Sequence, residues 1–348
     1  MANMANTMED TYYLGIDVGS VSTNFVVIDK KGELIEKLYI KTGGRPIKAL
    51  CEGLEYIGDA MAKHTGSKPA GEEYGDKNVN IGGVGATGSG RQIAAVVAGA
   101  DVVKNEITAH AVAAQHIVPD VRTILEIGGQ DSKIIILKNG VVYDFGMNTV
   151  CAAGTGSFLD RQAARLGIPI EEFGSYALRS KSPVRIAGRC AVFAESDMIH
   201  KQQAGYILED IICGLCEGLV RNYLNNLAKG KEIAEPIIFQ GGVAANAGIV
   251  AAFKKLLGKE IIIPEHYDVM GAYGAALIAR DVMVKKNQRS RFRGFRAAHD
   301  EYESKSIECN GCSNMCEIVE IMSNGNPIAR WGDKCGKWAL NIQVFEYN

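Results

Sequence analysis

The sequence lacks both a long apolar run and an excess of charge of either sign. No uninterrupted apolar stretch approaches the roughly 20 residues that a membrane-spanning helix needs. The N-terminal MANMANTMED has neither a basic start nor an apolar core, so we expect a cytoplasmic protein with no secretory signal and no membrane partner. The net charge of −2 also argues against a general nucleic-acid-binding protein, which needs a pronounced basic surface.

The six histidines show no spacing typical of metal ligands, but nine cysteines are present. In a reducing compartment disulfides do not explain them, so each is a packing residue, a metal ligand or a reactive thiol. Cys213 and Cys216 lie inside one apolar helical pattern and are interpreted as core, and Cys51 is interpreted in the same way.

The chain has 348 residues, of which 47% are hydrophobic, enough for two domains and an appendage. Apolar patterns alternate between strand and helix periods, which predicts an α/β fold. We expect strands near 12–18, 24–29, 34–41 and 79–85, and helices near 46–64, 106–117, 152–166, 200–229 and 269–286.

An internal repeat organises the chain. LGIDVGSVSTNFVVIDKKGEL, from Leu14, and ILEIGGQDSKIIILKNGVV, from Ile124, share one order of features: strand, acid, glycine turn, strand, charged glycine turn. Each is predicted to be a β-hairpin whose backbone N–H groups converge on an anion, while its acid holds a hydrated Mg²⁺. Two such hairpins could grip one nucleotide from opposite sides. The alternative is a pair of ordinary hairpins.

Two further glycine-rich elements follow. FQGGVAANAG, from Phe239, joins a predicted strand to a predicted helix, a turn that lets a ligand approach the backbone closely. GAYGAA, from Gly271, lies within a helix of small residues, which suits close packing against another element.

A cysteine stands where a helix is predicted to begin, at Cys151 in NTVCAAGTGSF, and Cys190 in AGRCAVFAESD has similarly small neighbours. The unpaired N–H groups and the positive dipole end of a helix start favour an anionic ligand. Considered alone, a single cysteine such as Cys151 is better explained by packing.

These motifs, together with GVGATGSGR and MGAYGAALIA, resemble the ATPase activators (component A) of 2-hydroxyacyl-CoA dehydratases and their benzoyl-CoA reductase and double-cubane cluster protein relatives. That group of BadF/BadG/BcrA/BcrD-like ATPases belongs to the actin, sugar kinase and Hsp70 superfamily. The resemblance covers about residues 12 to 283. It implies a two-lobed, actin-like (ribonuclease H-like) ATPase fold.

The resemblance implies ATP or ADP and Mg²⁺ as ligands, with roles residue by residue. Asp17 would organise Mg²⁺ through water, and either Glu126 or Gln130 would position the attacking water. The remaining nucleotide-binding residues implied are Gly19, Ser20, Ser22, Thr23, Gly128, Gly129, Asp131, Lys133, Gly241, Gly242, Val243, Asn246 and Gly271.

It also implies an oxygen-sensitive homodimer with one bridging 4Fe-4S cluster, to which each subunit contributes Cys151 and Cys190. Such a protein would take electrons from reduced ferredoxin or flavodoxin and, driven by ATP, pass them to a partner dehydratase, reductase or double-cubane cluster protein. The alternative function is a small-molecule kinase or a regulatory nucleotide-binding protein of the same superfamily, without a redox cluster.

A second thiol cluster lies in the tail, which the resemblance does not cover: Cys309, Cys312, Cys316 and Cys335. Four cysteines at this spacing predict a Zn²⁺ site or a further Fe-S cluster, with a labile thiol patch as the alternative. The preceding KKNQRSRFRGFR is read as a solvated linker or as a docking patch for an acidic partner.

The expected organisation is a disordered tail (1–11), a first ATPase subdomain (12–118, with a returning helix 269–284), a second subdomain with the cluster cysteines (119–268), a basic linker (285–304) and a Cys-rich module (305–348).

Overall fold

The computed structural model describes residues 11–66 and 79–338, which form two compact units. Unit 1 comprises residues 1–109 and 271–348, and unit 2 comprises residues 110–270. The first ten residues of the tail expected at 1–11 lie outside the described residues, as do the last ten residues of the Cys-rich module. No helix in the described ranges is long and apolar enough to cross a membrane.

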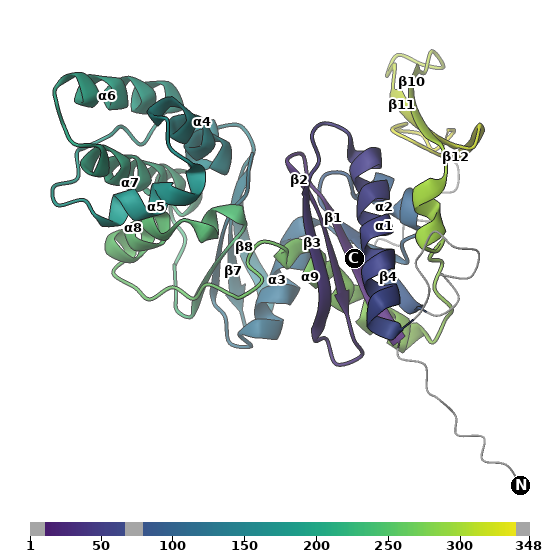
Figure 1. Ribbon diagram of the computed structural model, residues 1–348. Coiled ribbons are helices and arrows are strands. Elements are labelled where there is room, and N and C mark those ends of the chain that lie inside the picture. The colour runs from purple at the N-terminus through teal and green to yellow at the C-terminus, as the bar shows by residue number, and fades with distance from the viewer. Residues whose placement is uncertain (1–10, 67–78, 339–348) are drawn as a thin grey trace, which may run out of the picture. The chain divides into compact units, whose positions relative to one another are not determined.

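Unit 1 is built on a five-stranded sheet of order β3-β2-β1-β4-β5. Figure 1 labels β1 to β4 of this sheet. β1 pairs antiparallel with β2 and parallel with β4. The bounds of its elements are β1 Thr11–Val18, β2 Ser22–Ile28, β3 Leu34–Lys41, α1 Pro46–Thr65, β4 Asn80–Thr87, α2 Arg91–Ala98, β5 Val102–Val103 and α9 Met270–Lys286.

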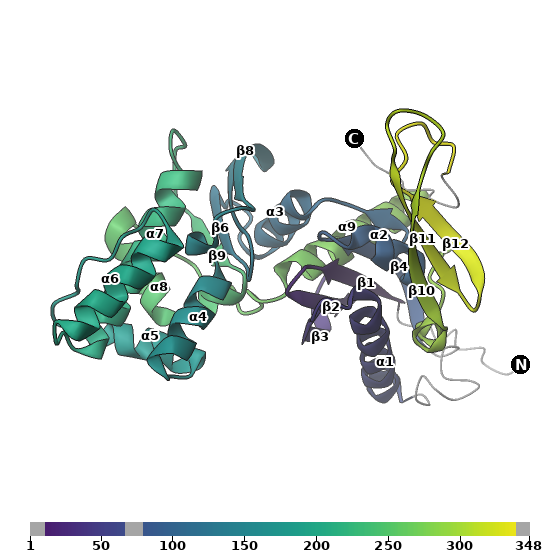
Figure 2. The same ribbon diagram turned by 90° about the horizontal axis from the view of Figure 1, so that it is seen from above.

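The two faces of β1 are covered differently. Leu14, Ile16 and Val18 point into a core shared with α1 and α2. On the opposite face, a Cβ added to Gly15 would lie 1.8 Å from the Ala272 carbonyl oxygen of α9. Figure 2 shows α1 and α9 on opposite sides of these strands. The small-residue helix therefore packs backbone to backbone, as its composition predicted.

Unit 2 repeats this plan with a four-stranded sheet of order β8-β7-β6-β9. β6 pairs antiparallel with β7 and parallel with β9, as β1 does with β2 and β4. The bounds of its elements are α3 Glu106–Ile117, β6 Thr123–Ile127, β7 Ser132–Lys138, β8 Val141–Asn148, α4 Gly156–Leu166, α5 Ile170–Leu178, α6 Ala191–Gln203, α7 Leu208–Leu227, β9 Ile237–Gln240 and α8 Ala247–Leu257.

One face of this second sheet is apolar and the other carries polar groups. Leu125, Ile127 and Ile134 pack under helices of unit 2 in one large core. The alternate residues Glu126, Lys133 and Gln240 are also buried, and Gln240 bonds to His110 of α3 at 2.7 Å. Most of α3 therefore belongs to unit 2, which begins at His110.

Several predicted helices differ from those observed. The helix expected over 200–229 is two helices, α6 and α7, because Gly205 between them has φ +80°. The helix expected from 152 begins at Gly156, after a 3-10 turn over Ala152–Gly154. Two helices, α2 and α5, were not expected.

The C-terminal part of unit 1 begins with the basic stretch at 285–304 that was interpreted as a linker. Residues of this stretch pack against the rest of unit 1. The Arg293 backbone N–H donates to the Ala98 carbonyl at 3.0 Å, and Phe295 is a buried member of the unit 1 core. A 3-10 turn over Phe295–His299 packs on α1. The chain then forms a separate antiparallel sheet of order β10-β11-β12, with bounds β10 Tyr302–Glu308, β11 Glu317–Ser323 and β12 Asn326–Trp331.

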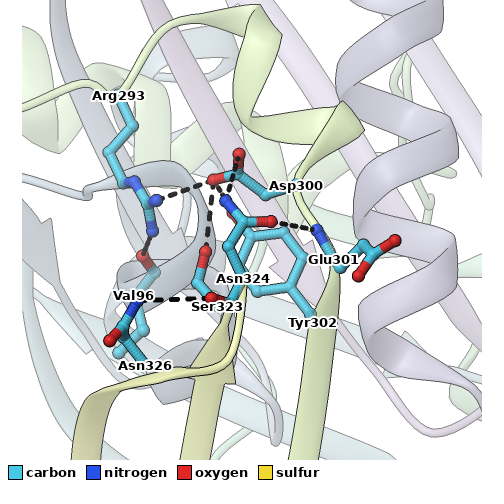
Figure 3. A network of polar contacts seen from close by, with 8 residues as sticks. All are labelled: Val96, Arg293, Asp300, Glu301, Tyr302, Ser323, Asn324 and Asn326. Carbon is cyan, nitrogen blue, oxygen red and sulfur yellow. Dashed lines mark hydrogen bonds and ion pairs between the residues drawn. The ribbon is translucent and has the colours of Figure 1, made fainter.

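Asp300 anchors this small sheet (Figure 3). Its carboxylate accepts hydrogen bonds from Arg293 at 2.8 Å, from Asn324 at 3.2 Å and from Ser323 at 3.3 Å. Arg293 also donates to the Val96 carbonyl of α2 at 3.2 Å. One arginine therefore links the body of unit 1 to the C-terminal sheet.

Candidate functional site

The two predicted phosphate hairpins have the same turn geometry. The Gly19 N–H donates to the Ser22 carbonyl at 2.8 Å, and the Gly128 N–H donates to the Asp131 carbonyl at 3.0 Å. In both hairpins the turn is thus closed by a hydrogen bond from the glycine N–H to the carbonyl of the third residue after it. The repeat read from the sequence is a repeat of backbone structure.

Each hairpin also has an acid near the end of its first strand, and glycine backbone packs against the carboxylate. A Cβ on Gly88 would lie 2.3 Å from Asp17 Oδ1, and a Cβ on Gly271 would lie 2.0 Å from Asp17 Oδ2. In unit 2, a Cβ on Gly241 would lie 2.8 Å from Glu126 Oε1. Only a residue without a side chain fits against these carboxylates.

The surroundings of the two acids differ. Asp17 is partly exposed. Glu126 is buried, and its carboxylate lies 3.1 Å from Lys133 Nζ, which is also 2.9 Å from Asp131. Burial alone would lower the pKa of Lys133, but the two carboxylates outweigh burial and raise that pKa above its ordinary value. Lys133 therefore stays charged between them.

The remaining predicted nucleotide residues have the following positions. Ser20 and Gln130 are exposed in their turns, whereas Ser22 and Thr23 begin β2 and Thr23 is buried. Gly241 has φ +87°, Gly242 and Val243 begin a 3-10 turn, and the Asn246 side chain caps α8 by accepting from the Gly248 and Ile249 N–H groups. The turn at 241–246 thus lies next to Glu126 in unit 2.

The second phosphate turn is joined to the helix that follows Cys151. The Gly156 N–H donates to the Gly128 carbonyl at 2.9 Å. Ser157 donates twice to the Gly129 carbonyl, through its N–H at 2.9 Å and its hydroxyl at 2.5 Å. The turn at 128–129 is therefore hydrogen-bonded directly to the N-terminus of α4.

Both cysteines that were predicted to bind a cluster occupy the residue before a helical segment. Cys151 precedes the 3-10 turn that leads into α4, and Cys190 precedes α6. Neither makes a side-chain capping bond. The Cys151 backbone is fixed on both sides by Asn148, which accepts from its N–H at 2.9 Å and donates to its carbonyl at 2.8 Å.

One turn of α7 supports both cysteine loops. A Cβ on Gly154 would lie 2.8 Å from Asn222 Oδ1, and a Cβ on Gly188 would lie 2.8 Å from the Gly218 carbonyl. The Asn222 amide nitrogen is 4.0 Å from Cys151 Sγ. Residues 218–222 of α7 therefore hold the two loops close to one another.

Some supporting residues were missed by the sequence analysis. Thr42 donates to the Gly19 carbonyl at 2.8 Å and lies 3.0 Å from the Thr23 hydroxyl, so it braces the first turn. Gly88 lies inside the motif GVGATGSGR. The sequence GSG within this motif could have indicated a glycine turn there. Ser157 and Asn222 had no signal, because their roles depend on contacts between distant segments.

The other cysteines are distributed as follows. Cys216 is fully buried, and Cys213 and Cys51 are half-buried within helices. Burial raises the pKa of Cys51 to about 11, which makes it an unreactive thiol at neutral pH. Within residues 11–66 and 79–338, no group of three or more His, Cys, Asp or Glu side chains is arranged to hold a metal ion.

Comparison with known proteins bears on this site. The model of the BadF/BadG/BcrA/BcrD ATPase family matches residues 14–279. The chain belongs to that family. The 2-hydroxyisocaproyl-CoA dehydratase activator of Clostridioides difficile is 34% identical over 282 residues, which are 80% of this chain and 98% of that protein.

Solved structures agree with this family assignment. Component A of the Acidaminococcus fermentans (R)-2-hydroxyglutaryl-CoA dehydratase has a TM-score of 0.68 and 31% identity, over 79% of this chain and 99% of that one. The Clostridium difficile activator of 2-hydroxyisocaproyl-CoA dehydratase with bound ADPNP has a TM-score of 0.67 and 32% identity. The match covers 79% of this chain and 97% of that one. The expected family and actin-like ATPase fold are confirmed. The family match ends at residue 279, before the C-terminal sheet.

Proposed function

We propose that this ATPase is an electron-transfer activator that uses ATP to drive one-electron reduction of a partner iron-sulfur enzyme. The observation that supports this most strongly is the common support of Cys151 and Cys190 on one turn of α7. A packing role would not require two separate loops to present a thiol beside the same helical turn. The relatives named as dehydratase activators favour the same class of partner.

The residues at the two cysteines fit a 4Fe-4S cluster shared between two copies of the chain. One copy supplies two thiols, and a cluster with four thiolate ligands needs a second pair from a twofold-related copy. A bound cluster of this kind supplies one-electron transfer at low potential. The helix starts behind both cysteines favour its negative charge.

The surface beside the cysteines suits contact with that second copy. Val150, next to Cys151, is 94% exposed, and Val192 and Phe193, after Cys190, are 69% and 64% exposed. Large apolar side chains with this exposure are typical of an interface. Burying them in a homodimer would also exclude water from the four thiolates.

For nucleotide hydrolysis, we assign separate roles to the three predicted catalytic residues. Asp17 holds Mg²⁺ through water at its partly exposed position. Gln130, exposed at the tip of the second hairpin, orients the attacking water, whereas the Glu126 carboxylate keeps Lys133 charged and in place. In each unit the N–H groups of the turn are donors for phosphate oxygens, and in unit 2 the turn at 241–246 binds adenosine.

Coupling follows from the bonds between Gly129 and Ser157. A phosphate bound at the second turn fixes that turn, and through Ser157 it biases the direction of α4 and the position of Cys151. ATP shifts the protein towards the transferring conformation only if it binds that conformation more tightly than the resting one. Reduced ferredoxin or flavodoxin is the proposed donor, and a dehydratase, reductase or double-cubane cluster protein is the acceptor, all in the cytoplasm.

The test is iron and acid-labile sulfide in anaerobically purified protein. We expect about four irons per dimer, as for one bridging 4Fe-4S cluster, with loss of iron in Cys151→Ala and in Cys190→Ala. Cys213→Ala, a half-buried cysteine within α7, is the control and should keep its iron. Protein free of iron despite strict anaerobic handling would favour the small-molecule kinase or the regulatory nucleotide-binding protein.

A further inference from the structure

The C-terminal sheet brings two of its cysteines together at one end. The last pair of the β10–β11 ladder is Glu308 with Glu317, directly before Cys309 and directly after Cys316. The Cys309 N–H donates to the Cys316 carbonyl at 2.8 Å. These two cysteines are therefore cross-strand neighbours at the base of the loop that joins the strands.

The third cysteine lies inside that loop. The Met315 N–H donates to the Cys312 carbonyl at 3.2 Å, and Met315 has φ +42°. The loop thus turns back on itself between Cys312 and Cys316. Only six residues separate Cys309 from Cys316, so Cys312 stays at the same end of the sheet.

The segment after β12 returns the fourth cysteine to this end. A Cβ on Gly332 would lie 2.3 Å from the Glu317 carbonyl, beside Cys316. Six residues later, the Trp338 indole N–H donates to Cys309 Sγ at 3.2 Å. Cys335 lies midway between these two contacts. The backbone therefore places all four cysteines around one end of the sheet.

We propose that Cys309, Cys312, Cys316 and Cys335 bind one zinc ion. Four thiolates are a tetrahedral donor set that zinc prefers in structural sites. On binding, the four thiols release their protons to solvent and form four Zn–S bonds, with no change of oxidation state. In this structure the Cys335 thiol is instead directed at Asp333 Oδ2, at 3.7 Å. Zinc binding therefore requires side-chain rotation and adjustment of the two loops, not a change in strand pairing.

The size of the sheet explains why a metal is useful there. Its fully buried aliphatic side chains are Ile318, Ile321 and Ala329. Such a small apolar core contributes little to stability, and small modules commonly add a structural metal. The C-terminal sheet also lies outside the family match, so a closed zinc site fits better than a further redox cluster.

Elemental analysis of the full-length protein tests the zinc site independently of the proposed iron cluster. We expect about one zinc per chain in the wild type, as for a closed four-thiolate site, and its loss in Cys312→Ser and Cys335→Ser, both at exposed positions. Cys51→Ser is the matched control and should keep zinc. Cys151→Ala should lose iron and keep zinc, which separates failure of this proposal from failure of the proposed function.

Two further measurements distinguish loss of the zinc site from misfolding of the variants and from binding of zinc at another place. Cobalt substituted for zinc should give thiolate-to-cobalt charge-transfer absorption that disappears in Cys312→Ser. Removing zinc with a chelator should accelerate hydrogen exchange in β10, β11 and β12 while β1 and β6 stay protected. The proposal is overturned if the wild type binds no zinc after reconstitution, if zinc is unaffected by both serine variants, or if iron follows Cys312 and Cys335.

Discussion

Gly88 of unit 1 and Gly241 of unit 2 occupy equivalent positions in the two sheets. Each directly follows the strand that runs parallel to an acid-bearing strand, β4 beside Asp17 and β9 beside Glu126. Their φ angles are +85° and +87°. In both units, therefore, a glycine with positive φ lets the backbone after the parallel strand pack directly against the carboxylate.

Gly241→Ala should abolish nucleotide binding. The added Cβ would meet the Ile127 carbonyl oxygen at 2.5 Å and force an unfavourable φ, at a cost of about 1–3 kcal/mol in unfolding free energy. Titration calorimetry with ADP and urea unfolding measure the two effects. Gly258→Ala is the matched control, because Gly258 has φ +62° but no atom within 4 Å of the new Cβ. Equal nucleotide affinity in both variants would contradict a role for the 241–246 turn.

Ser157→Ala should uncouple nucleotide binding from the cysteine loop. Loss of one hydrogen bond costs about 1 kcal/mol, so ATP affinity should fall less than about tenfold. The change that ADPNP causes in the electron paramagnetic resonance spectrum of the reduced protein should shrink much more. Ser175→Ala removes a comparable hydroxyl bond, to Glu172 in α5, and should behave as wild type. An unchanged spectral response in Ser157→Ala would show that coupling uses another path.

Glu126→Gln and Gln130→Ala should affect different properties. Glu126→Gln removes one of two carboxylates from buried Lys133, so unfolding free energy should fall by about 3 kcal/mol. Gln130→Ala changes an exposed side chain, so stability should be unchanged while ATP turnover falls about 100-fold. Urea unfolding and phosphate release separate the effects. A stable but inactive Glu126→Gln beside an active Gln130→Ala would reverse the assignment.

His110 should make unit 2 sensitive to acid. Burial, and then the nearby charge of Lys133, lower the pKa of His110 from 6.5 to about 3. Below pH 6.5 His110 is protonated in the unfolded chain but stays neutral in the folded chain. The free energy of unfolding therefore decreases by about 1.4 kcal/mol for each unit by which the pH is lowered, until the folded-state pKa near 3 is reached. Above pH 6.5 this dependence disappears.

Urea unfolding of wild type and His110→Asn at pH 7, 6 and 5 checks this slope. The variant should be less steep between pH 6 and 5, although its stability at pH 7 also falls with the loss of the bond to Gln240. His200→Asn, at an exposed position of α6, is the control and should keep the wild-type slope. Parallel slopes for wild type and His110→Asn would contradict the assignment.

The sequence predicted those features of the fold that depend on local pattern. The hairpins, the 241–246 turn and the small-residue helix α9 were predicted because glycine, alternation and acid positions lie within a few residues of one another. α5 was missed although Pro169 and the acids Glu171 and Glu172 mark its start, because its nine residues give a short apolar period.

The candidate site was only partly predictable for the same reason. Cys151 and Cys190 could be singled out from their small neighbours and the family resemblance. Their shared support could not, because Asn222 is 71 residues from Cys151 and its role depends on how α7 packs. The break near Gly205 also required the structure, since only the four residues 204–207 separate α6 from α7 and Gly205 is the one glycine among them.

The docking of the C-terminal segment has a practical consequence for truncation. A chain shortened to residue 286, close to the end of the family match, loses Phe292 and Phe295, which stack edge to face with ring centroids 5.1 Å apart. It also uncovers the surface of α1 on which the 3-10 turn packs. A fragment trimmed to the boundaries of its relatives would therefore be prone to aggregation, and domain dissection of this protein should keep residues 287–300 with the ATPase.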